Sequence, residues 1–138
     1  MRRTAALGDG WLPAWLLPED IEKRFRELKE TAAGLGRNPD AIHLGIEVYG
    51  CIDEDSRKAR EAGLGTLAIG RSTFERLMTV DQLAEVSLIG SPAEIRRTVQ
   101  AYADAGVSHF EIKFIYPTLE RHSEMLQLFA REILPAFR

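Results

Sequence analysis

The sequence predicts an α/β fold with a parallel sheet, and two observations lead to this prediction. Segments with the period of a strand alternate along the chain with segments that have the period of a helix, which is the pattern of right-handed βαβ crossovers. In addition, residues 90–117 read as a capped helix, a glycine stop and a strand whose two faces differ in chemistry. We expect three strands within one domain over residues 1–138, whereas a complete (β/α)₈ barrel takes about 250 residues. The pattern alone leaves open a small open α/β domain or part of a barrel.

The first elements are predicted by their end signals. Residues 1–7 are expected to be the last turns of a helix that ends at Gly8, followed by a very short strand or extended stretch. A proline and two acidic residues at 18–20 begin the next helix, because they suit a first turn and the positive end of the helix dipole. The segment GLGRNP at 34–39 ends that helix.

Residues 41–52 are predicted to form the longest strand. Asp53 is expected to cap the helix after it, which should end near Gly63. The strand's alternation places apolar residues on one face and polar residues or glycine on the other: Ile42, Leu44, Ile46 and Val48 against His43, Gly45, Glu47 and Tyr49.

The remaining chain contains an excursion, the helix–strand unit and a final helix. Segments 70–78 and 79–86 are predicted to be two short helices. In the unit that follows, Ser91 and Glu94 make a capping box and Gly106 ends the helix. The strand after it should direct Phe110, Ile112 and Phe114 to one face and His109, Glu111 and Lys113 to the other. The final helix is expected to present an apolar stripe of Leu119, His122, Leu126, Phe129 and Ile133.

Composition narrows the classes of partner and compartment. The formal net charge of −3 argues against nucleic acid and anionic membranes as partners. The apolar run at 11–18 is too short and too rich in proline to span a bilayer, and no signal peptide is evident. The single cysteine, Cys51, excludes an internal disulfide and fits the cytoplasm, and its apolar strand indicates a buried, inert thiol.

Five segments together resemble the C-terminal part of the bacterial luciferase-like monooxygenase family: RRTAALGDGWLP, GLGRNPDAI, DEDSRKAREAG, GSPAEIRRTVQAYADAGVSHFEIKF and LFAREILPAF. No single one of these segments is specific to the family, and the resemblance rests on their order and spacing. The resemblance implies a partial TIM barrel that consists of the last three βα units, and FMN or a deazaflavin as the cofactor. It also implies that about the first five units are absent, that Met1 falls within a helix of the full-length enzyme, and that most of the cofactor site is missing.

The resemblance and the strand faces together give candidate site residues. In a barrel, the polar strand faces line the lumen, where Lys113 is a candidate for binding a phosphate or carboxylate, beside Glu47 and Glu111. The alternative, which we favour, is a structural charge layer or a solvated face. Arg71 is a candidate anion ligand by the family's use of mobile loops, and a surface arginine is the alternative that we favour.

Asp9 and Trp11 are candidate cofactor contacts, because GDGW falls at a strand end of the family. A turn residue and a packing residue are the alternatives that we favour. No catalytic residue is assigned, and the three histidines lack the spacing of metal ligands, so no metal is expected.

Three functions remain open at this point. The chain is a luciferase-like oxidoreductase that is incomplete as a catalyst alone, a non-catalytic α/β module that associates with itself, or an unrelated small ligand-binding domain. For the first two we expect a homo-oligomer, such as a dimer, or a chain that completes the barrel. Three parallel strands with open edges and faces would otherwise remain uncovered.

Overall fold

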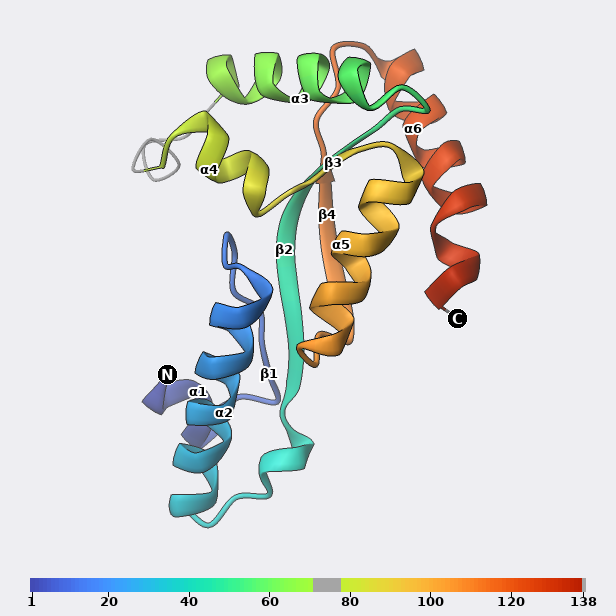
Figure 1. The fold of residues 1–138 in the computed structure, drawn as a ribbon. Coiled ribbons are helices and arrows are strands. Elements are labelled where there is room, and N and C mark those ends of the chain that lie inside the picture. The colour runs from blue at the N-terminus through green and yellow to red at the C-terminus, as the bar shows by residue number, and fades with distance from the viewer. Residues whose placement is uncertain (71–77, 138) are drawn as a thin grey trace. The chain divides into compact units, whose positions relative to one another are not determined.

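The computed structural model describes residues 1–70 and 78–137 and has the predicted α/β fold (Figure 1). Its contacts form two compact units, residues 1–47 with 101–111 and residues 48–100 with 112–138. The described elements are α1 (Arg2–Leu7), β1 (Gly10–Trp11), α2 (Pro18–Gly34), η1 (Pro39–Ala41), β2 (His43–Ile52), α3 (Ser56–Gly70), α4 (Val80–Glu85), β3 (Leu88–Gly90), α5 (Pro92–Asp104), β4 (His109–Phe114), α6 (Leu119–Glu132) and η3 (Leu134–Phe137). Strands β2 and β4 and helix α5 each contribute to both units. The single domain over residues 1–138 stays a prediction.

The first unit is built around α1 and α2, which pack side by side (Figure 1). Between them and the start of β2 lies a core of Ala5, Leu28, Ala32 and Ile42, with the ring of Trp11 packed against it. Small residues in both helices permit this close approach, and the apolar contacts stabilise the unit.

The guanidinium of Arg37 closes the C-terminal end of α1. It donates hydrogen bonds to the carbonyl oxygens of Ala5, at 3.1 Å, and Gly8, at 2.8 Å. The last carbonyls of a helix have no partner within the helix, so this arginine satisfies them and ties α1 to the loop after α2.

The second unit places its helices around the later strand segments. Helix α3 packs on β3 and α4 (Figure 1). At Gly63 the contact is close, because a Cβ there would lie 3.1 Å from Ile89 and 3.3 Å from the Cβ of Cys51. The thiol of Cys51 is 1% exposed, and burial raises its pKa, which agrees with the predicted inert cysteine.

The strands are parallel, as predicted. Strand β1 pairs with the start of β2 in the register Gly10–His43, and β3 pairs with its end in the register Ile52–Gly90. Strand β4 also pairs with β2. In the first unit, the amide of Ser108 donates a hydrogen bond to the carbonyl oxygen of Leu44. In the second unit, the amide of Ile115 donates one to the carbonyl oxygen of Gly50. The residue numbers of both strands therefore increase in the same direction.

The predicted alternation of strand faces is confirmed. In β2, Leu44, Ile46 and Val48 are at most 1% exposed, whereas Glu47 and Tyr49 are half-buried. In β4 the side chains at 109, 111 and 113 are exposed and those at 110, 112 and 114 are half-buried. Within each unit, the apolar faces of β2 and β4 lie on the same side of the sheet, and so do their polar faces.

The contacts that a Cβ would make at two glycines of β2 show this alignment of the faces of β2 and β4. In the first unit, a Cβ on Gly45 would lie 3.5 Å from the His109 ring, so the odd-numbered positions share a face. In the second unit, a Cβ on Gly50 would lie 2.6 Å from Cγ2 of Ile112, so the even-numbered positions share the other.

Among the described residues, two of these elements differ from the prediction. A fourth strand, β3, is present among the described residues, and its three residues were too few to give a strand period. Helix α3 begins at Ser56 and continues through Gly63 to Gly70, because an isolated glycine does not end a helix that retains its contacts. Helix α4 confirms the second short helix, whereas most of the first, at 70–78, lies outside the described residues.

The prediction of the apolar stripe of α6 was also partly wrong. Leu119 is 76% exposed and Leu126 is 44% exposed, and His122 is only half-buried. The buried residues are Met125, Leu128, Phe129 and Ile133. Both sets have helical spacing, so the sequence did not decide which way the helix turns about its axis.

Candidate functional site

The carboxyl ends of parallel strands are where α/β folds place their ligands. In the second unit, β2 is followed directly by Asp53, and β3 is followed by Ser91 at the start of α5. The loop after β4 leads to α6, whose first turn carries Arg121. A ligand site is therefore expected at these strand ends.

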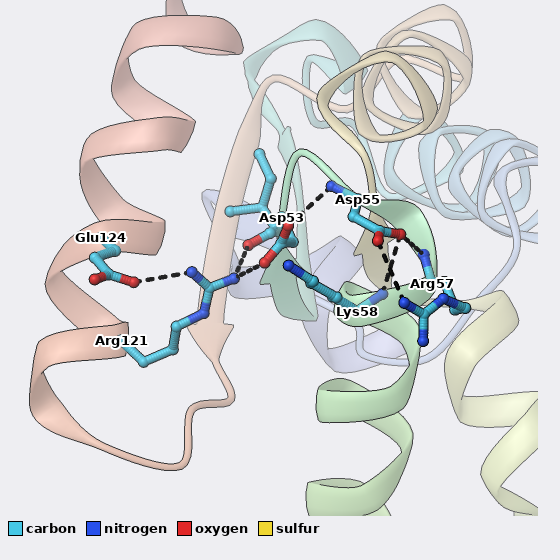
Figure 2. A network of polar contacts seen from close by, with 7 residues as sticks. Asp53, Asp55, Arg57, Lys58, Arg121 and Glu124 are labelled. Carbon is cyan, nitrogen blue, oxygen red and sulfur yellow. Dashed lines mark hydrogen bonds and ion pairs between the residues drawn. The ribbon is translucent and has the colours of Figure 1, made fainter.

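Arg121 and Asp53 form the centre of a polar network at this edge (Figure 2). The guanidinium also donates to the carbonyl oxygen of Ile52, at 3.3 Å, and to the carboxylate of Glu124, at 2.9 Å. The hydrogen bond to Glu124 raises the pKa of Arg121 further above its ordinary value. Because Asp53 and Arg121 are only 18% and 28% exposed, their pairing fixes the start of α6 to the end of β2.

A second carboxylate beside this network caps α3 (Figure 2). The Oδ1 atom of Asp55 accepts hydrogen bonds from the amides of Arg57, at 2.9 Å, and Lys58, at 3.4 Å. Asp53 instead accepts the amide of Asp55, at 2.8 Å. The prediction that Asp53 caps the helix was therefore wrong by two residues, since both aspartates suit a cap by type alone.

A hollow of about 310 Å³ lies beside the network, lined by residues that include Asp53, Glu54, Arg121, Glu124 and Arg131. Its charges are of both signs, and Arg131 approaches Glu54 to 3.6 Å. Charges that pair with one another leave little net attraction for a charged ligand, so the geometry favours a structural role.

A cleft of about 500 Å³ lies among α3, α4, β3 and α5. Two arginines, Arg60 and Arg97, line it together with the acidic residues Asp81, Glu85 and Glu94. The Arg60–Glu94 ion pair, at 3.4 Å, connects α3 with α5 within the cleft. This lining suits neither a strongly anionic ligand nor an apolar ring.

Glu94 completes the predicted capping box at the start of α5. Its carboxylate accepts hydrogen bonds from the amide and the hydroxyl of Ser91, both at 2.8 Å. The hydrogen bond from the Ser56 hydroxyl, followed by those from Ser91, lowers the pKa of Glu94 to about 2. The ionised form is therefore the one that the folded chain stabilises.

This lowered pKa predicts a pH-dependent contribution to stability. Because the pKa of Glu94 is lower in the folded than in the unfolded chain, its contribution is present above about pH 4.5 and is lost as the pH falls toward about 2. We expect Glu94→Gln to destabilise the chain near neutral pH, with a difference from wild type that shrinks over that acidic window. Urea unfolding at a series of pH values measures it, with Glu22→Gln, in an exposed part of α2, as the control. A difference that stays constant with pH would contradict this role.

The predicted anion-binding residues lie on the polar strand faces. In the first unit, the half-buried Glu47 and the exposed Glu111 share the face that also contains His109. In the second unit, the exposed Lys113 shares its face with Tyr49. Arg71 lies outside the described residues. Roles of these side chains toward a ligand stay predictions.

The two predicted cofactor contacts have other partners in the structure. The carboxylate of Asp9 is 98% exposed and lies 3.6 Å from a nitrogen of Arg37, while its carbonyl oxygen accepts the amide of His43. The ring of Trp11 packs against the core of the first unit. These contacts agree with a turn residue and a packing residue, and a role toward a cofactor stays a prediction.

The Asp53–Arg121 pair was missed because 68 residues separate its members along the chain. The sequence does give a signal for each half. Asp53 follows a long predicted strand, and Arg121 falls in the first turn of a helix capped by Thr118. An arginine in a first turn opposes the helix dipole, which indicates that a carboxylate partner holds it there.

A flavin or deazaflavin requires a cation for its phosphate and an apolar slot for its ring system. Lys113 is an exposed cation on β4 and fits the first requirement. The clefts among α3, α4, β3 and α5 and beside Arg121 are lined mainly by charged and polar side chains and do not fit the second.

A cluster of metal ligands and a membrane-spanning helix are both absent among residues 1–70 and 78–137. No group of three or more histidine, cysteine or acidic side chains there has the arrangement of a metal site. No helix in the same residues has the length and hydropathy needed to cross a bilayer.

Sequence comparison assigns the family. The model of the luciferase-like monooxygenase family matches residues 1–109, which is most of the chain. The chain belongs to this family. The resemblance seen in its turns and caps is thereby confirmed. A search of curated protein sequences found no significant match.

Solved structures of luciferase-like proteins have the same fold. They include a coenzyme F420 dependent tetrahydromethanopterin reductase from Methanopyrus kandleri (TM-score 0.74, 22% identity) and an F420-dependent secondary alcohol dehydrogenase in complex with an F420-acetone adduct (TM-score 0.76, 18% identity). A monooxygenase from Streptomyces bottropensis is a third (TM-score 0.74, 21% identity). Each comparison covers 99% of this chain but only 48%, 45% and 44% of the respective structure. The luciferase-like chain therefore spans about half the length of these TIM-barrel enzymes.

Proposed function

We propose that this luciferase-like chain is part of a flavin- or deazaflavin-dependent oxidoreductase and is incomplete as a catalyst alone. The observation that carries the proposal is the family match over residues 1–109 on a fold that spans about half of the matched enzymes. Two of those enzymes are named for coenzyme F420, and the family resemblance implies FMN or a deazaflavin, so F420 and FMN are the cofactors to test. The remaining strands of such a barrel lie outside residues 1–138, and a second copy or another chain is the source that we propose.

The contribution of this chain is the polar face of its strands. In a barrel this face lines the lumen, and Lys113 would bind the cofactor's phosphate or an anionic substrate through a charge-assisted hydrogen bond. Glu47 and Glu111 would offset positive charge at the polar faces of β2 and β4. We derive no chemical step from these residues, and no catalytic residue is assigned.

Titration with FMN and with F420 tests the proposal. Saturable binding is expected, and Lys113→Ala should weaken it about tenfold through the loss of one charge-assisted contact. Lys23→Ala, which removes an exposed lysine of α2, should leave binding unchanged. Lack of saturable binding of both cofactors, at protein concentrations that span any self-association, would overturn the proposal.

A non-catalytic, self-associating α/β module is the second candidate. The observation that favours it is that β4 has three exposed side chains and, among the described residues, β2 as its one strand neighbour. Self-association without cofactor binding would decide for this candidate. Under either function we propose a cytoplasmic protein, on the basis of its single, buried cysteine.

A further inference from the structure

The cleft among α3, α4, β3 and α5 carries charges of opposite sign on two of its helices. The acids Asp81 and Glu85 line it from α4, and Arg97 lines it from α5. The described lining residues all fall within 60–98, in the second unit, so the cleft is formed within that unit alone. Its lining also contains three apolar side chains that are buried or half-buried, those of Leu64, Ala84 and Ile89.

The two acids of α4 are placed unfavourably for the helix itself. Asp81 and Glu85 are four residues apart, so they share a helix face and repel each other. Asp81 lies in the first turn, where the helix dipole favours an acid, but Glu85 is the last residue of the helix, where the dipole opposes it. Neither carboxylate forms an ion pair within the part of the chain that the structure describes. A positively charged group bound between them would offset this repulsion.

Arg97 is an exposed arginine of α5 that forms no ion pair with the described residues. The acid three residues before it, Glu94, instead contacts Ser91 and Arg60. The guanidinium of Arg97 is therefore available to an anionic group. In contrast, the other described arginines of the second unit each contact a carboxylate: Arg57, Arg60, Arg96, Arg121 and Arg131.

We propose that this cleft binds a small zwitterion of about the size of a dipeptide, with its ammonium group at Asp81 and Glu85 and its carboxylate at Arg97. A planar guanidinium can hold a carboxylate through two parallel hydrogen bonds. The apolar middle of such a ligand would contact Leu64 and Ile89. The volume of about 500 Å³ is in the usual range for small-molecule sites.

The balance of charges distinguishes a zwitterion from simpler ions. Once Arg60 and Glu94 are paired with each other, the described lining retains two acids and one arginine. A simple anion would be repelled by the two acids, and a simple cation would leave Arg97 without a partner. Binding here is separate from the proposed flavin site, because Lys113 does not line this cleft.

Blocked forms of one dipeptide test the ligand class. Glycyl-leucine is added to the isotopically labelled chain, and we expect saturable amide shifts in NMR spectra at Ser87 and Ile89, which line the cleft. The N-acetyl derivative lacks the ammonium group and the C-terminal amide derivative lacks the carboxylate, so each should bind about tenfold more weakly. Equal affinity for all three compounds, or no saturable shift at these residues, overturns the proposal.

Two variants test which side chains hold the two ends of the ligand. Glu85→Gln should weaken binding of glycyl-leucine about tenfold and leave binding of the N-acetyl derivative unchanged. Arg97→Gln should have the same effect on glycyl-leucine and leave binding of the amide derivative unchanged. If either variant weakens the free and the blocked form equally, the assignment of that end is overturned.

Matched controls come from α2, where Arg24 and Glu27 are exposed and do not line the cleft. Arg24→Gln and Glu27→Gln change the net charge by the same amounts as the two cleft variants and should leave binding of glycyl-leucine unchanged. A loss as large in these controls as in the cleft variants would show that overall charge determines binding, and would overturn the proposal. Circular dichroism checks that every variant keeps its fold.

Discussion

Replacing Tyr102 by alanine is expected to lower the free energy of unfolding by about 3–5 kcal/mol, the usual cost of removing a fully buried aromatic side chain. The side chain is 0% exposed and packs edge-on against Phe110 in the first unit. Its hydroxyl donates a 2.8 Å hydrogen bond to the carbonyl oxygen of Leu16. Burial raises the pKa of Tyr102 to about 12, so it remains a neutral donor at any ordinary pH. Urea unfolding followed by circular dichroism measures the loss.

Tyr102→Phe separates the hydroxyl from the ring. It keeps the packing and removes the donor to Leu16, so we expect a loss of about 1 kcal/mol. If the phenylalanine and alanine variants lose the same stability, the hydrogen bond and not the ring is the main contribution, contrary to this account.

Gly50→Ala is expected to cost about 2 kcal/mol by overpacking the second unit. A Cβ at this position would lie 2.6 Å from Cγ2 of Ile112 and 3.2 Å from the ring of Phe114. The Cγ2 atom belongs to a β-branched side chain with few available rotamers, so it cannot move away at low cost. The same contact is the evidence that β2 and β4 keep their apolar faces in phase. Thermal and urea unfolding measure the loss.

Two companion variants make this test specific. In an Ile112→Ala background the clash is absent, and Gly50→Ala should cost at least 1 kcal/mol less there, by roughly the interaction energy of touching side chains. Gly65→Ala, in α3, has no atom within 4 Å of the added Cβ and should stabilise the chain by about 0.5–1 kcal/mol. Equal costs of Gly50→Ala in both backgrounds would show that the side chain of Ile112 does not contact position 50.

The sequence was sufficient to predict those features that depend on the residues of one helix or strand alone. The cap of α5 at Ser91 and its end at Gly106, which has φ +95°, follow from residue types that only such positions favour. The alternation in β2 and β4 was predictable because a side-chain period of two leaves no other arrangement for a strand with one buried face.

Features that depend on contacts between distant segments were not predictable. The rotation of α6, with Met125 and not Leu126 in the core, depends on what the helix packs against. The Asp53–Arg121 pair joins two elements that the sequence gave no reason to bring together. The short strand β3 exists because the end of β2 offers it a partner.

The candidate site was predicted only in outline. The polar residues of β2 and β4 do lie on one strand face within each unit, as expected for the wall of a barrel. The sequence does not specify their binding of a ligand, because the chain matches only about half of each related enzyme.

Amide chemical-shift mapping by NMR, with FMN or F420 added to the isotopically labelled chain, tests the central claim most directly. We predict saturable shifts along the polar strand face, at Tyr49 and Lys113. Shifts confined to the cleft at Arg60 and Arg97, or no shifts at all with excess cofactor, would contradict the proposal that this strand face forms part of a flavin site.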